Sequence, residues 1–130
     1  MVFELFNNEE NKESYLNMKE AVIHFLQALN EDKSKAIYVM QHEIIPKVKT
    51  KEDIRYFLDM LAQFFEDLLN ILSNREITIK SYATILGELA NKLSHISDSL
   101  VEILKQRSII NLNVNTSLLL DHLTNYIVKE

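Results

Sequence analysis

The spacing of apolar residues along the chain predicts helices from its first third onward. Over residues 9–29 and again over residues 34–45, apolar side chains recur every three or four positions, with charged side chains opposite them. A third helix is expected over residues 50–73, where Thr50 and Asp53 have the spacing of a capping box. Its apolar stripe is wider than one neighbour needs, so this helix is expected at the centre: Ile54, Phe57, Leu58, Leu61, Phe64, Phe65, Leu68, Leu69 and Leu72.

Two more helices are expected in the second half of the chain. Residues 81–108 carry apolar side chains at alternating steps of three and four, which predicts one long fourth helix, and residues 116–128 predict a fifth. Gly87 lies inside the fourth pattern and costs about 1 kcal/mol relative to alanine there. Gly87 therefore marks either a close crossing of two helices or a start of the fourth helix later than residue 81. Pro46 is expected to end the second helix by restricting the residue before it.

The fold class that follows is all-α, a single five-helix bundle-like domain over residues 1–130. One Gly and one Pro in the whole chain leave few residues for β-hairpins and tight turns. The apolar start, residues 1–8, is expected to be the docking end of a helix, or of a linker from preceding domains.

An Asn-rich break separates the last two predicted helices. Asparagines alternate with apolar residues through it, and hydroxyl residues follow at once. These side chains are expected to cap the turn by hydrogen bonding to the backbone groups that the helix ends leave unpaired. The candidate turn and capping residues are Asn111, Asn113, Asn115 and Thr116.

The final helix carries two apolar stripes, although a short terminal helix needs only one to dock on its own domain. The first stripe is Leu119, Leu120, Leu123 and Ile127. The second, formed by Leu118, His122 and Tyr126, is a candidate partner interface. The alternative is that the helix is sunk between two neighbours within its own domain.

The composition of the chain favours some classes of binding partner over others. The net charge is −5, which does not favour nucleic-acid binding, and there is no cysteine for disulfides or thiolate chemistry. No apolar run approaches the ~20 residues of a membrane span, so the chain is expected to be soluble and cytoplasmic. The one basic cluster, residues 46–51 with Arg55, is expected to be a solvated loop; the alternative is contact with phosphate or an acidic partner.

Catalytic and metal-binding motifs are incomplete. His42 and Glu43 begin like the zinc-protease HExxH motif, but Pro46 stands where the second histidine ligand is needed. All four histidines are expected to have surface or capping roles. No Gly-rich phosphate loop is present. The sequence therefore predicts no catalytic residues, metal, cofactor or small-molecule ligand, and an enzyme or metal-binding bundle is disfavoured.

Residues 103–123, ILKQRSIINLNVNTSLLLDHL, resemble the end of the delta-prime subunit of the bacterial DNA polymerase III clamp loader. That family closes with a long helix, a turn carrying an N-x-N signature, and a leucine-rich helix of the form N-x-x-L-x-L-[ED]-x-L. The residues at these places are Asn113, Val114, Asn115, Leu118, Leu120, Asp121, His122 and Leu123.

The resemblance implies a collar domain that is not itself catalytic. In that family the C-terminal domains of five subunits form a ring during DNA replication, within a holoenzyme that is a DNA-directed DNA polymerase. The implied partners are the tau/gamma and delta subunits, contacted through the last two helices, and the AAA+ domains of the family lie outside this sequence. Two alternatives stay open: the collar of a sister subunit (delta or tau/gamma), or an unrelated helical adaptor that binds a partner helix.

A first test concerns the Asn-rich turn. Asn113→Ala is expected to destabilise the chain by about 1 kcal/mol, because a turn or cap hydrogen bond is lost. Thermal unfolding measures this change, and an unchanged melting midpoint would refute the capping role.

Overall fold

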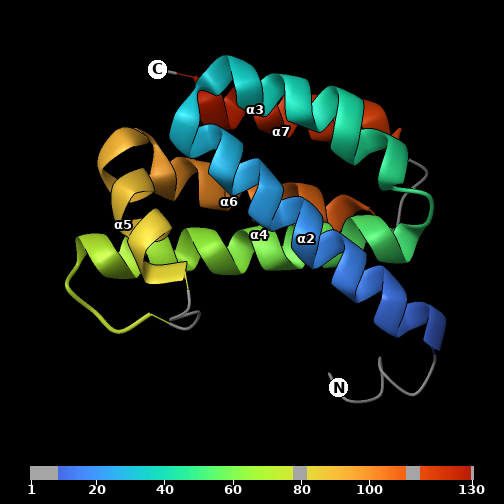
Figure 1. Ribbon diagram of the computed structural model, residues 1–130, viewed down its shortest axis with the longest axis horizontal. Coiled ribbons are helices and arrows are strands. Elements are labelled where there is room, and N and C mark those ends of the chain that lie inside the picture. Colours follow the sequence, from blue (N-terminus) through green and yellow to red (C-terminus); the bar gives the residue numbers. More distant parts are fainter. Residues whose placement is uncertain (1–8, 78–81, 111–114, 130) are drawn as a thin grey trace.

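The computed structural model describes residues 9–77, 82–110 and 115–129, and these residues are helical apart from short connections (Figure 1). The α-helices are α2 (Glu9–Glu31), α3 (Lys33–Val39), α4 (Lys51–Leu72), α5 (Ala83–Lys92), α6 (Ile96–Ile109) and α7 (Thr116–Val128). The π-helix η1 (Met40–Ile44) and the 3-10 turn η2 (Ile45–Lys47) continue α3. The all-α prediction is confirmed. The five-helix count is wrong for the described residues, which contain six α-helices.

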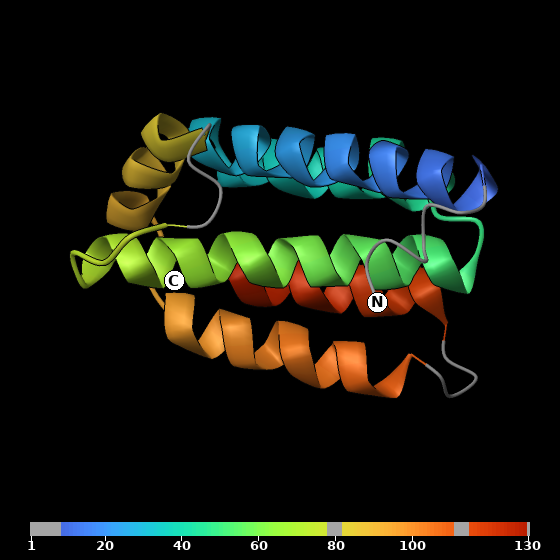
Figure 2. The same ribbon diagram turned by 90° about the horizontal axis from the view of Figure 1, so that it is seen from below.

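Helix α4 lies in the middle of the molecule, as the width of its apolar stripe predicts. Figure 2 shows α2 and α3 on one side of α4 and α6 on the other, with α5 across one end, while α7 packs against α6 and α3. The side chains of Phe57, Leu61, Phe65 and Leu68 are completely buried among these neighbours. Helices α2, α5 and α6 therefore cover the apolar stripe of α4, and α3 and α7 complete the fold around α2 and α6.

The start of α4 has the predicted capping box. The Thr50 hydroxyl accepts a hydrogen bond from the Asp53 N–H at 3.1 Å, and the Asp53 carboxylate accepts one from the Thr50 N–H at 3.2 Å. Upstream, the link between α2 and α3 is a single residue, Asp32, whose carboxylate accepts from the Ser34 N–H at 3.0 Å. Short polar caps thus replace glycine turns in this chain.

The region around Pro46 corrects one expectation. Ile45 keeps right-handed helical angles (φ −53°, ψ −44°), and Pro46 lies inside the 3-10 turn; the chain turns extended only at Val48. Before the proline the helix widens, and the Ile45 N–H donates to the carbonyl of Met40, five residues back. A wider turn relieves the clash of a proline ring with the carbonyl four residues earlier, so the helical path continues past Pro46.

The predicted long helix over residues 81–108 is two helices. It breaks after Lys92, and His95 adopts left-handed angles (φ 47°, ψ 34°) before α6 begins at Ile96. Histidine is among the non-glycine residues found in this conformation. The apolar period does not reveal the break, because Leu93 is partly buried against the core and keeps the helical spacing across it.

Helix α5 is fastened to the end of α2 by polar contacts. The side-chain amide of Asn30 donates to Glu88 at 2.6 Å, and the Lys92 ammonium donates to the Asn30 carbonyl at 2.5 Å. A lysine on the last carbonyls of a helix satisfies groups that lack an intrahelical partner. These contacts hold α5 across α2 instead of in line with α6.

Gly87 has neither of the roles expected for it. The helix starts before it, at Ala83. Among the described residues, no atom beyond the local helix backbone lies within 4 Å of the position that a Cβ on Gly87 would take. The glycine is therefore not required by a close helix crossing.

This geometry makes Gly87→Ala a stabilising substitution. We expect the free energy of unfolding to rise by about 0.5–1 kcal/mol, because alanine loses less backbone entropy in a helix interior and meets no clash here. Chemical denaturation measures the change. A lower free energy of unfolding would show that the space around Gly87 is needed.

Candidate functional site

The C-terminal helices carry half of the large apolar side chains that the described residues leave exposed. The full set is Leu16, Tyr38, Leu72, Val101, Leu104 and Leu118. Leu118, on the first turn of α7, is the most exposed of them at 67%. The surface of α6 and α7 is therefore the candidate site for binding another protein.

The predicted second stripe of α7 lies along the seam with α6. His122 is 55% exposed, and its Nε2 lies 3.0 Å from a carboxylate oxygen of Glu102 on α6. Tyr126 is half-buried; its ring centroid lies 6.3 Å from that of His122, and the Lys129 ammonium stands 5.5 Å from it. The structure therefore places Leu118, His122 and Tyr126 in one row at the edge of the domain.

The α6 side of this seam is not predicted by the sequence. Glu102 is only 13% exposed, and the Gln106 side-chain amide donates to it at 2.7 Å. This hydrogen bond lowers the pKa of the Glu102 carboxyl; burial opposes the shift, and the contacts with His122 and the Lys105 charge add to it. The four-residue spacing of Glu102 and Gln106 is a helical signal for this pair, but nothing local in the sequence links them to His122.

Only part of the Asn-rich turn lies within the described residues. Asn115 is the N-cap of α7: its side-chain oxygen accepts from the Leu118 N–H at 3.0 Å, and its carbonyl accepts from the Leu119 N–H at 3.0 Å. Thr116 is the first residue of the helix and is not the cap. Asn111 and Asn113 lie outside the described residues. The cap fixes the turn of α7 that presents Leu118.

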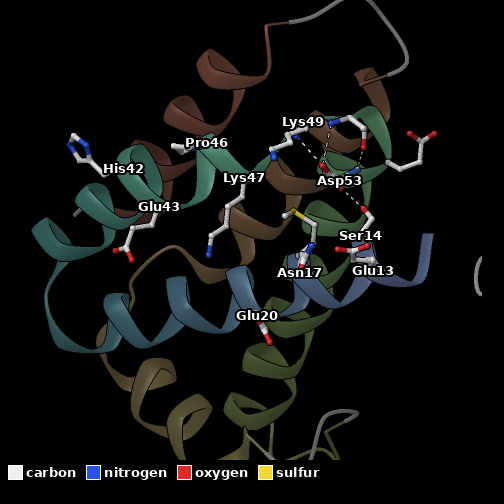
Figure 3. A pocket seen from close by; sticks show the side chains of 13 residues that line it. Glu13, Ser14, Asn17, Glu20, His42, Glu43, Pro46, Lys47, Lys49 and Asp53 are labelled. Atoms are coloured by element: carbon white, nitrogen blue, oxygen red, sulfur yellow. Dashed lines mark hydrogen bonds between the residues drawn. The ribbon is translucent and has the colours of Figure 1, made fainter. Parts of the chain in front are cut away.

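A second feature is a polar cleft of about 800 Å³ between α2 and the segment from η1 to the start of α4 (Figure 3). Lys47 and Lys49 of the basic cluster line it together with the carboxylates of Glu13, Glu20 and Glu43. The basic cluster therefore faces acidic side chains of its own chain as well as solvent.

Buried Asp53 closes one end of this cleft. Its carboxylate accepts from the backbone N–H groups of Lys49 at 2.9 Å and Thr50 at 3.2 Å, and from the hydroxyl of Ser14 on α2 (Figure 3). The carboxylate thus ties α2 to the cap of α4 through three hydrogen bonds within the fold.

The histidines are spread over the surface. His24 Nδ1 lies 3.8 Å from a Glu43 carboxylate oxygen, and the His42 ring packs on Tyr38 with centroids 4.5 Å apart. His95 stands at the N-cap of α6 without a side-chain cap bond. Within the part of the chain that the structure describes, no three His, Asp or Glu side chains gather closely enough to hold a metal ion.

Comparison with known proteins gives no match: no protein-family model, curated protein sequence or solved structure is significantly similar to this chain. None of the described helices combines the length and apolar composition needed to cross a membrane.

The Glu102 carboxyl makes the α6–α7 seam sensitive to acid. Because the pKa of the Glu102 carboxyl is lowered in the folded chain relative to the unfolded chain, its contribution to stability is present above the unfolded pKa and is lost as the pH falls through the folded pKa. We expect the melting midpoint of the wild-type chain to fall more steeply than that of Glu102→Gln between about pH 5 and pH 3. Parallel slopes for the two proteins would contradict this assignment.

Proposed function

We propose that this chain is a non-catalytic interaction domain that holds a neighbouring helical domain through the exposed flank of α7. Its specific form is the collar domain of a clamp-loader subunit, delta-prime, acting in the bacterial cytoplasm during DNA replication. The exposure of Leu118 is the observation that carries this proposal. Leu118 lies on a well-capped helical turn and is two-thirds open to solvent, so covering it with a partner lowers the free energy of the complex.

The two stripes of α7 divide the work of folding and binding. Leu119, Leu120, Leu123 and Ile127 are buried in the domain's own core. The row of Leu118, His122 and Tyr126 lies at the edge, held by the Asn115 cap and by the His122–Glu102 contact. An apolar anchor beside a tyrosine and a histidine suits a protein interface, where aromatic residues are enriched and polar groups form the rim.

The collar is favoured over other interaction domains by the resemblance of residues 103–123 to the end of the delta-prime family. The residues that carry this resemblance include Asn115, which caps α7, and Leu118, which the cap presents. A collar binds by lateral packing of helices, and an edge row on a terminal helix supports contacts of that kind. The partners are then the C-terminal domains of tau/gamma and delta.

The other candidate is a helical adaptor that uses the same row to bind one amphipathic partner helix. It shares the interaction surface but not the partner. The two functions are therefore separated by the identity of the partner and not by the surface.

The test mixes the chain with the C-terminal domains of tau/gamma and delta and measures the mass of the complex by sedimentation. Association is expected at tens of micromolar. Leu118→Asp should weaken it by about 2 kcal/mol, or about thirtyfold in Kd, because a buried apolar contact becomes a buried charge. Leu72→Asp is the matched control, since Leu72 is an exposed leucine at the far end of α4 and its replacement should leave Kd unchanged.

The wild-type chain remaining alone in this mixture would contradict the collar function and favour the adaptor. A second mixture contains the delta-prime collar in place of the delta collar. Association in that mixture would assign the chain to a sister subunit. Equal effects of Leu118→Asp and Leu72→Asp would show that the α7 row is not the contact.

A further inference from the structure

The outward face of α6 is a second exposed surface, distinct from the α7 row. The core-facing side of α6 carries the buried side chains of Ile96, Ile103 and Ile110. Glu102 of α6 contacts His122 of α7. On its other flank, the Arg107 guanidinium donates to Asp59 of α4 at 2.6 Å. The side opposite the core points away from the rest of the described chain, and α6 forms the outer edge of the molecule in Figure 2.

This outward face has the spacing of a helix-pairing seam. Ser97, Val101, Leu104 and Ser108 follow one another at steps of four, three and four, which is the alternation of the two core positions of a heptad. Val101 is 63% exposed and Leu104 is 48% exposed. Two aliphatic side chains thus stand at the middle of the seam, with a small hydroxyl residue at each end.

Charged residues run along one flank of this seam. Asp98 lies in the first turn of α6 and Lys105 lies two turns later, and both are exposed on the same flank. In an antiparallel helix pair related by a twofold axis, the same flank of each helix meets its counterpart. Asp98 of each copy then faces Lys105 of the other copy, which gives two equivalent charge pairs.

The seam residues of α6 match those of a second α6 that runs in the opposite direction. A twofold axis midway between Val101 and Leu104 sets each Val101 against the Leu104 of the other copy. It also sets Ser97 against the other Ser108 and Asp98 beside the other Lys105. Small residues at both ends let the helices approach closely, and both charge pairs are attractive.

We infer that the outward face of α6 binds the same face of a second copy of this chain, forming an antiparallel, twofold-symmetric dimer. The occupant is a second copy because charge and size match under reversal of the helix. The contact is one short helix pair with two aliphatic residues from each side, so the dimer belongs to the weak, reversible class.

The test is sedimentation equilibrium of the full 130-residue chain at low salt, from about 5 to about 500 µM. The average mass is expected to rise from one chain to two across this range. Val101→Asp should hold the mass at one chain throughout. A constant one-chain mass for the wild-type protein at every concentration would overturn the inference.

Charge-reversal variants test the antiparallel arrangement of the dimer specifically. Asp98→Lys and Lys105→Glu each place like charges together twice in the dimer, so each single change should raise the dissociation constant about tenfold. The double variant restores opposite charges at both places and should return to within about threefold of the wild type. A double variant as weak as the singles would overturn the antiparallel arrangement, and far-ultraviolet circular dichroism checks that all variants keep their helices.

Leu118→Asp separates this surface from the row proposed above for partner binding. Because Leu118 lies on α7 and outside the α6 seam, its replacement should leave the self-association unchanged. Loss of the dimer in Leu118→Asp would overturn the assignment to α6, while failure of the clamp-loader mixing experiment would leave this dimer intact.

Discussion

Burial of the wide apolar stripe of α4 is the constraint on which the rest of the structure depends. Its buried phenylalanines and leucines form a stripe wider than one neighbouring helix can cover, while Asp59 and Glu66 stay exposed on the remaining face. Helix α2 covers one side and α6 the other, and α5 closes the end. Because the helices bury most of their apolar side chains in this core, the large apolar side chains that stay exposed are candidates for other roles.

Half of these exposed side chains, Val101, Leu104 and Leu118, lie on two surfaces that differ in their surroundings. The α7 row is supported from below by the Asn115 cap and by the contact of His122 with Glu102, and it presents one large anchor at its end. The α6 seam is distinguished instead by a sequence of residues that matches its own reverse order. The first surface is the one proposed to bind a different partner, and the second is the one proposed to bind an identical copy.

Much of the fold follows from periodicity and capping chemistry in the sequence. The limits of α7, the Thr50–Asp53 cap and the central place of α4 were all predictable from residue types and spacing. The break at His95 was not, because Leu89, Leu93 and Ile96 keep a helical spacing whether or not the backbone turns. The row on α7 could be predicted as a stripe, whereas its link to Glu102 depends on how α6 and α7 pack, which no local pattern specifies.

The corner at His95 also sets the length of the molecule. A single helix running from the start of α5 to the end of α6 would be about 40 Å long, while α4 measures about 33 Å. The surplus would project beyond the core and leave its apolar residues without cover. By turning there, the chain places α5 across the ends of α2 and α4, so that its apolar residues are covered and α6 runs back along the side of α4.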